Sequence, residues 1–240
     1  MAPEAQAEWV TLADGLSGFV ARPSAAPRGG VIVFQEIFGV NAHIRDVAQR
    51  VAAQGYLVIA PDIFHRTAPR FEVGYDSAGV TEGRKHKEAC TLDGLFDDTK
   101  ACMAWLEAQG VRDIGCVGFC FGGHVTFLAA TLPGMKAAAC FYGGGISTTR
   151  PGGGPPSLEL APKLRANLRL FYGQNDAMIP EAQVEAIAHK LASVGAKFEI
   201  IVYHDAGHGF ACDQRPDYRA DKADDAWRHT FALFAEHLRG

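Results

Sequence analysis

Short apolar runs alternate with longer amphipathic segments along most of the chain. The apolar runs are rich in Val, Ile, Phe and Tyr, which is typical of strands that are covered on both faces. These predicted strands span residues 31–34, 56–60, 115–118, 137–142, 168–172 and 198–203. Helical periodicity predicts helices at residues 43–54, 92–109, 123–132, 181–194 and 221–238. The alternation predicts an α/β fold with a mostly parallel, doubly wound sheet flanked by helices.

Three other segments complete the predicted organisation. Residues 8–21 hold two short runs around Asp14-Gly15, a pattern that favours an antiparallel hairpin at the edge of the sheet. The stretch PGGGPP at residues 151–156 is the strongest loop signal, but the strand rhythm continues beyond it, so we expect a surface loop. Residues 66–87 are polar and mixed, which favours an excursion over one rim of the sheet. We therefore expect a single domain over residues 1–240.

Composition narrows the class of protein. Hydrophobic residues make up 48% of the chain and charged residues 21%, which is typical of a globular domain. The net charge of −4 and the lack of a basic run argue against a nucleic-acid partner. No apolar stretch reaches the roughly 18 residues of a membrane span, so we expect no membrane partner. The opening residues do not resemble a secretory signal, so we expect a cytoplasmic protein, and the helix patterns favour a monomer.

The six cysteines do not form a recognisable framework. No two of them make a C-x-x-C pair, and the nearest two, Cys116 and Cys120, are four residues apart. That spacing fits neither a zinc ribbon nor a redox dithiol. We expect free thiols, most of them buried as small hydrophobic side chains. The sequence gives no reason to expect a metal or any other cofactor.

The stretch IGCVGFCFGGH at residues 114–124 carries the clearest chemical signal. An apolar strand runs into G-x-C-x-G and a helical pattern follows at once, which is the nucleophile-elbow arrangement with Cys120 in the place of serine. The N-terminus of the following helix stabilises a thiolate and a developing oxyanion. A bare G-x-C-x-G motif is equally compatible with a buried core cysteine in a glycine turn. Residues elsewhere in the chain distinguish the nucleophile from the core cysteine.

A thiol nucleophile needs a base, and the base needs a group that orients it. In elbow hydrolases the chain order is nucleophile, acid, histidine. Asp176 follows the predicted strand 168–172, and His208, flanked by glycines, follows the strand 198–203. Both lie where open α/β sheets hold their ligands. His204 is an alternative base and Asp205 an alternative orienter, and we favour His208 and Asp176.

Glu36 follows the first apolar strand and lies beside an Ile-Phe pair, where a carboxylate is suited to proton transfer. The alternative interpretation is a solvated carboxylate at the start of a loop. The backbone N–H groups of Ile37 and Phe121 are the candidates for an oxyanion hole. His124 is expected in the core or behind the site. The remaining histidines have no partner pattern, and we expect most of them to be exposed: His43, His65, His86, His189, His229 and His237.

Several of these motifs resemble the dienelactone hydrolase family, the carboxymethylenebutenolidases. They are QEIFGVN at residues 35–41, Pro61-Asp62, GFCFGG at residues 118–123, the Asp176 loop and AGHGF at residues 206–210. The resemblance runs from about residue 10 to residue 238. It implies an α/β-hydrolase fold and a triad of Cys120, His208 and Asp176. It also implies opening of an enol-lactone ring, as in the conversion of dienelactone to maleylacetate.

The resemblance also implies further roles and reveals one departure. Glu36 would hold the resting thiol and take its proton when substrate binds. The family binds the substrate carboxylate with two arginines, and one of these positions is Cys212 in this chain. The other arginine falls near Arg84, and Arg215, three residues beyond Cys212, is either a substitute or a surface charge. Without such an arginine–carboxylate contact, the binding free energy of an anionic substrate is less favourable by about 1.5–3 kcal/mol. Phe38 and Tyr142 complete the predicted substrate-binding set.

Three functions remain open at this point. The first is a dienelactone-hydrolase-like enzyme that acts on a small lactone or ester. The second is a broader carboxylesterase or thioesterase for neutral substrates, which Cys212 favours. The third is a non-catalytic or redox-sensing protein with Cys120 as a reactive thiol. The chain order of Cys120, Asp176 and His208 argues against the third, because a sensor needs no triad.

Overall fold

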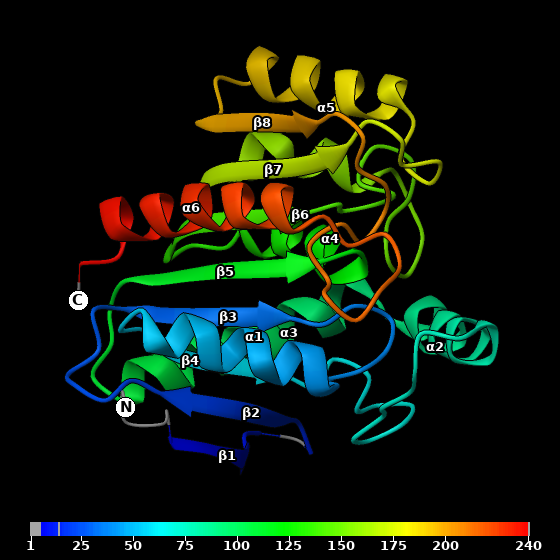
Figure 1. Ribbon diagram of the computed structural model, residues 1–240. Helices are drawn as coiled ribbons and strands as arrows, with labels where there is room; N and C mark the ends of the chain where they lie inside the picture. Colours follow the sequence, from blue (N-terminus) through cyan, green and yellow to red (C-terminus); the bar gives the residue numbers. More distant parts are fainter. Residues whose placement is uncertain (1–5, 14, 240) are drawn as a thin grey trace.

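A single eight-stranded sheet runs through the computed structural model, which describes residues 6–13 and 15–239 (Figure 1). The strand order is β1-β2-β4-β3-β5-β6-β7-β8. Strands β3 to β8 are parallel, and β1 and β2 form the antiparallel edge. The strands are β1 Gln6–Thr11, β2 Ser17–Arg22, β3 Gly30–Phe34, β4 Leu57–Pro61, β5 Ile114–Phe119, β6 Met135–Phe141, β7 Asn167–Gly173 and β8 Phe198–Tyr203.

Helices cover both faces of this sheet. The helices are α1 Ala42–Ala53, α2 Ser77–Ala89, α3 Leu92–Ala108, α4 Phe121–Ala129, η1 Ser157–Lys163, α5 Glu181–Ser193 and α6 Ala220–His237. Helices α1 and α6 lie on one face and α3 and α4 on the other, while α2 stands beyond the carboxyl ends of the strands (Figure 1). The mostly parallel, doubly wound sheet predicted from the sequence is confirmed. Within the described ranges, no helix is both long and apolar enough to cross a membrane.

Local sequence explains where the central elements begin and end. Every residue of β3 and β4 is buried, as their unbroken apolar runs predict. Helix α1 begins after Asn41, whose side chain accepts a hydrogen bond from the Ile44 N–H at 3.2 Å. Helix α3 begins in the same way after Thr91, whose hydroxyl accepts from the Gly94 N–H. The predicted hairpin is present as β1 and β2, and Asp14 of its predicted turn lies outside the described residues.

The environment of β8 differs from the prediction. Its apolar run indicates a strand covered on both faces, but β8 is the outer strand and pairs only with β7. Five of its six residues are half-buried or exposed, and Val202 is 45% exposed. An edge position explains the difference, because helices cover the faces of an edge strand less completely than those of a central strand.

Two helical segments were not predicted. Helix α2 lies within the polar stretch where the sequence indicates only an excursion, and it buries only Gly79 and Gly83. A helix without an apolar stripe gives no periodic signal. The Asp76 cap, which accepts from the Gly79 N–H at 2.7 Å, is the one local signature of its start. The short helix η1 follows the predicted loop at residues 151–156.

The histidines and cysteines give one correction and one confirmation. The expected exposure of most remaining histidines was wrong: His43 and His65 are buried, and only His189 of the six is exposed. His43 packs edge-on against Phe119, and His65 pairs with a buried Asp98 oxygen at 3.2 Å. All six cysteines are free, and four are buried, as predicted.

Candidate active site

Cys120 lies at the sharp turn between β5 and α4. Its backbone has φ 55° and ψ −115°, a left-handed conformation that a side chain rarely adopts. The turn is held on one side by the Cys120 N–H, which donates to the Phe141 carbonyl at 3.0 Å. Cys120 is also the N-cap of α4, so the positive end of the helix dipole points at its thiol. The predicted elbow is therefore present in the backbone geometry.

The glycines beside Cys120 allow the backbone to turn so tightly. A Cβ atom at Gly118 would lie 2.2 Å from the carbonyl oxygen of Gly122. A Cβ atom at Gly122 would lie 2.3 Å from the carbonyl oxygen of Phe34. Both contacts are with backbone that cannot move aside. The G-x-C-x-G spacing is therefore a steric requirement of this turn.

His208 and Asp176 meet at the carboxyl ends of the neighbouring strands. Asp176 follows β7, is fully buried, and accepts a hydrogen bond from His208 Nδ1 at 2.8 Å through Oδ2. Its other oxygen accepts from the Met178 N–H at 2.9 Å, which holds the carboxylate in place. The alternatives are separated from this pair: His204 is exposed and bonded to Gln174, and Asp205 is exposed. The geometry thus pairs His208 with Asp176.

Charge around His208 sets its protonation. Burial lowers the pKa of His208, but the adjacent Cys120 sulfur and the Asp176 carboxylate outweigh burial and raise the pKa to about 10. His208 Nε2 has no hydrogen-bond partner among the described residues, and His208 and Cys120 line the same cleft. The Cys120 sulfur is thus near enough for its charge to act on the His208 ring.

Glu36 pairs with Arg215 in this structure rather than with the thiol. The buried Glu36 Oε1 accepts a hydrogen bond from Arg215 Nη1 at 3.2 Å, while Oε2 is buried and has no partner in the described part of the chain. Burial lowers the pKa of Arg215, but the facing Glu36 carboxylate reverses this and raises the pKa overall. The family resemblance implies that Glu36 holds the resting thiol. In this structure Glu36 forms an ion pair with Arg215 instead.

A cleft at this edge of the sheet contains most of the predicted site. It is lined by Ile37, Phe38, Val80, Arg84, Lys87, Cys120, Met178, His208 and Arg215. Both arginine candidates, Arg84 from α2 and Arg215, are therefore brought to Cys120. Sequence reasoning missed Val80 and Lys87, because it did not predict α2, and it missed Met178. A basic side chain one turn after Arg84 on a recognised helix is the signal that could have found Lys87.

Of the other predicted positions, Tyr142, Cys212 and His124 do not line this cleft. Tyr142 is fully buried, does not line the cleft and packs edge-on against the His208 ring, with centroids 5.2 Å apart. Cys212 is buried, and its thiol donates to the Tyr75 hydroxyl at 3.4 Å. Phe38 packs against the same tyrosine ring. As predicted, His124 lies in the core; its ring nitrogens contact the Gly144 carbonyl and the Ser157 hydroxyl.

Comparison with known proteins gives these residues a context. A model of the dienelactone hydrolase family matches residues 16–238. The chain belongs to the dienelactone hydrolase family. A relative from Synechocystis named "Putative carboxymethylenebutenolidase" is 42% identical over 93% of each chain. A relative of the same name from Escherichia coli K12 is 37% identical over 93% of this chain and 83% of the relative.

Solved structures agree with this membership. The structure named "Putative Dienelactone Hydrolase" from Klebsiella pneumoniae has a TM-score of 0.86 and 32% identity, and covers 96% of this chain and 98% of its own. An esterase from Thermogutta terrifontis with propionate bound has a TM-score of 0.70 at 19% identity, covering 98% and 95%, and shows the shared fold. The predicted α/β-hydrolase fold is confirmed.

Membership in the dienelactone hydrolase family makes the chain a hydrolase of lactone or ester bonds that acts on a small molecule. That finding argues against the non-catalytic alternative. The identity of the nucleophile and the nature of the substrate require the separate argument that follows.

Proposed function

We propose that this protein is a cysteine-dependent hydrolase that opens enol-lactones of the dienelactone type through Cys120, His208 and Asp176. The observation that carries the proposal is the elbow thiol in one cleft with a histidine that is hydrogen-bonded to a buried carboxylate. This is the relation of nucleophile, base and orienting group that covalent hydrolysis needs.

Substrate binding prepares the thiol through Glu36 and Arg215. A substrate carboxylate that enters the cleft competes with Glu36 for the Arg215 guanidinium, because both anions seek the same donor. The released Glu36 carboxylate then accepts the Cys120 proton. The ion pair seen between Glu36 and Arg215 supports this order of events, in which the reactive thiolate forms when a substrate is present.

Acylation follows from the position of the thiol. The Cys120 sulfur attacks the lactone carbonyl carbon, and the carbonyl electrons move to oxygen. The backbone N–H groups of Phe121, at the start of α4, and of Ile37 stabilise that oxyanion. When the tetrahedral intermediate collapses, the ring C–O bond breaks and the enolate leaves, which gives a thioester on Cys120. An enolate is a good leaving group, so a soft thiolate is a sufficient nucleophile.

Deacylation uses the change in charge that acylation produces. The thioester is neutral, so the largest influence that raises the pKa of His208 disappears when it forms. As its pKa falls, His208 gives its proton to the departing enolate, and the neutral ring then takes a proton from water while Asp176 keeps it oriented. The resulting hydroxide attacks the thioester, and the Cys120 thiolate leaves and takes its proton back from Glu36. His208 is therefore protonated during acylation and acts as a base during deacylation.

The charges of the cleft favour an anionic substrate. Arg84, Lys87 and Arg215 all line it, and Glu36 neutralises only one of them in the resting state. Arg215 supplies a cation despite the cysteine at position 212. The alternative is a broader carboxylesterase or thioesterase for neutral activated esters. Cys212 favours this alternative, because it occupies the position where the family resemblance implies an arginine.

A comparison of two substrates tests the proposal. We would measure kcat/KM for a carboxylate-bearing dienelactone and for the neutral ester p-nitrophenyl acetate. A retained arginine–carboxylate contact favours the dienelactone by roughly ten- to a hundredfold. Equal rates, or a preference for the neutral ester, would support the esterase alternative. No hydrolysis of either compound would overturn the proposal.

A further inference from the structure

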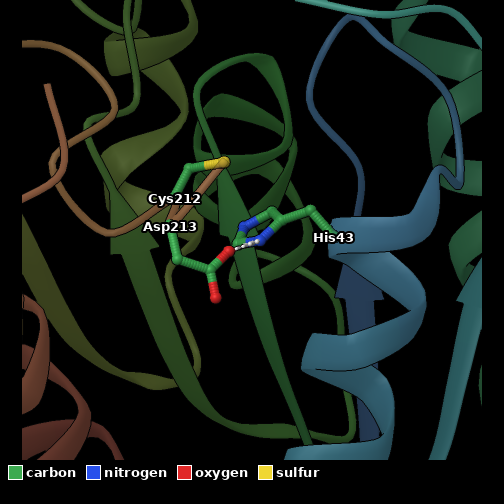
Figure 2. Close-up of side chains that lie close together, drawn as sticks. All are labelled: His43, Cys212 and Asp213. Atoms are coloured by element: carbon green, nitrogen blue, oxygen red, sulfur yellow. Dashed lines mark ion pairs between the residues drawn. The ribbon is translucent and has the colours of Figure 1, made fainter. Parts of the chain in front are cut away.

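A second group of cysteine, histidine and aspartate side chains lies outside the active-site cleft. His43 comes from α1, and Cys212 and Asp213 come from the turn that follows His208 (Figure 2). One nitrogen of His43, the Cys212 sulfur and one Asp213 oxygen all lie within 4.8 Å of one another. Figure 2 shows the three side chains pointing toward one another. None of them lines the cleft that contains Cys120.

His43 is the unexplained member of this group. Its side chain has no exposed surface, and its Nε2 has no partner among the described residues. Nδ1 approaches Asp213 Oδ1 at 3.3 Å, which is an ion-pair distance. Burying a polar nitrogen without a partner costs about 1–3 kcal/mol. Such an exception calls for a specific explanation, and a bound ion is one of the few available.

We propose that His43, Cys212 and Asp213 bind a single divalent cation of the zinc class. Imidazole, thiolate and carboxylate together are ligands that Zn²⁺ accepts, whereas Mg²⁺ and Ca²⁺ prefer oxygen alone. Cys212 releases its thiol proton to solvent when its sulfur bonds to the metal. Three protein ligands leave the fourth tetrahedral position to water.

The observed distances suit that geometry. Zinc bonds of about 2.0–2.3 Å place neighbouring tetrahedral ligands roughly 3.3–3.8 Å apart. The 3.3 Å separation between His43 and Asp213 already has this value, and the limit of 4.8 Å for the whole group leaves a side-chain adjustment of about 1 Å. The Asp213 side chain can make this adjustment because it is 46% exposed. The same exposure gives the ion a route from solvent.

Charges of both signs surround the site, because Arg50 acts on His43 and Arg215 acts on Cys212. Glu36 is near enough to act electrostatically on both His43 and Cys212, and its Oε2 is buried without a partner in the described part of the chain. The backbone of Cys212 also accepts a hydrogen bond from the Arg215 N–H at 3.1 Å. A bound cation would therefore sit between α1 and the turn that presents Arg215 to the cleft.

Cobalt replacement tests the proposal without using activity. We would titrate the protein with Co²⁺ and follow the thiolate-to-cobalt absorption band in the ultraviolet, and then displace Co²⁺ with Zn²⁺ in a calorimeter. We expect one equivalent to bind with a thiolate band. Cys212→Ser, which keeps the size of the side chain, should remove the band and weaken binding by roughly a hundredfold or more, since losing an outer-shell partner alone costs ten- to a hundredfold.

Control variants separate this site from the active-site thiol. Cys120→Ala should keep the band, because Cys120 and His208 would form a different site. Asp213→Asn, a change at a half-exposed position, should weaken binding by about tenfold without threatening the fold. The proposal is overturned if the wild-type protein shows no thiolate band. It is overturned equally if the band persists in Cys212→Ser or disappears in Cys120→Ala.

Discussion

The molecule contains two groups of the same three residue types near one edge of the sheet. Cys120, His208 and Asp176 form one, and Cys212, His43 and Asp213 form the other. In the first, the histidine ring is fastened by a hydrogen bond to a buried aspartate, and the thiol lies at a helix N-terminus. In the second, the ring contacts a half-exposed aspartate at 3.3 Å, and its Nε2 has no partner among the described residues.

This difference shows that residue type alone does not decide the chemistry. A nucleophile needs an open cleft, a helix N-terminus and an oriented base, and the group around Cys120 has all three. Cys212 is buried, and its thiol donates to the Tyr75 hydroxyl instead of facing the cleft. The three converging ligand atoms of its group fit a cation better than a substrate.

The largest expected effect comes from removing the elbow thiol. Cys120→Ala should lower kcat/KM by about 10⁴-fold or more while the fold persists, because covalent catalysis is lost but a small residue remains at the turn. Steady-state kinetics and circular dichroism check this. Cys102→Ala, a buried thiol on α3, is the matched control and should retain activity. If the Cys120→Ala enzyme kept more than a trace of activity, Cys120 would not be the nucleophile. The group around Cys120 would then not differ in this role from the group around Cys212.

Removing the base should have the next largest effect. His208→Gln should slow turnover by roughly 10³-fold, because water attack on the thioester loses its proton acceptor. His204→Gln is the matched control, since His204 follows the same strand but is exposed and bonded to Gln174. Single-turnover kinetics separate acylation from deacylation. Normal turnover in His208→Gln combined with a defect in His204→Gln would reverse the assignment.

A smaller effect is expected at the rim of the cleft. Arg84→Gln should raise KM for a carboxylate-bearing lactone by about ten- to a hundredfold and leave p-nitrophenyl acetate hydrolysis nearly unchanged. The reason is that Arg84 lines the cleft but, among the described residues, forms no ion pair of its own. The KM values of both substrates provide the measurement. An equal loss on both would show that Arg84 supports the fold of α2 instead.

The smallest effect concerns protonation of His208. Its folded-state pKa of about 10 lies above the ordinary value of 6.5, so the folded protein keeps a proton that the unfolded chain releases. This stabilisation is complete below pH 6.5 and is lost as the pH rises through about 10. In Cys120→Ala, the His208 pKa should fall, because the adjacent sulfur is gone. Nuclear magnetic resonance titration of His208 in both proteins checks the shift, and an unchanged pKa would contradict it.

Sequence alone predicted those parts of the site that depend on local backbone. The elbow at Cys120 is encoded by glycines that the turn requires, and β7 and β8 deliver Asp176 and His208 to the edge where parallel strands end. Their mutual hydrogen bond joins residues 32 positions apart, and chain order was sufficient to anticipate it. Local pattern and topology therefore account for the core of the site.

The rest of the site depends on tertiary contacts that leave no local pattern. Helix α2 buries only glycines, so the sequence did not reveal how Arg84 and Lys87 reach the cleft. The pairing of Glu36 with Arg215 spans 179 positions and depends on the path of the turn after His208. The meeting of His43 with Cys212 is equally non-local, so no spacing along the chain indicated the proposed metal site.

The most direct test of the central claim is to identify the residue that carries the acyl group. We would react His208→Gln with p-nitrophenyl acetate, quench the mixture in acid, and locate the added acetyl group by peptide mass spectrometry, with the wild-type enzyme quenched early as a reference. The account predicts one acetyl group on Cys120 and none on Cys212. An acetyl group on Cys212, or on no cysteine at all, would contradict it.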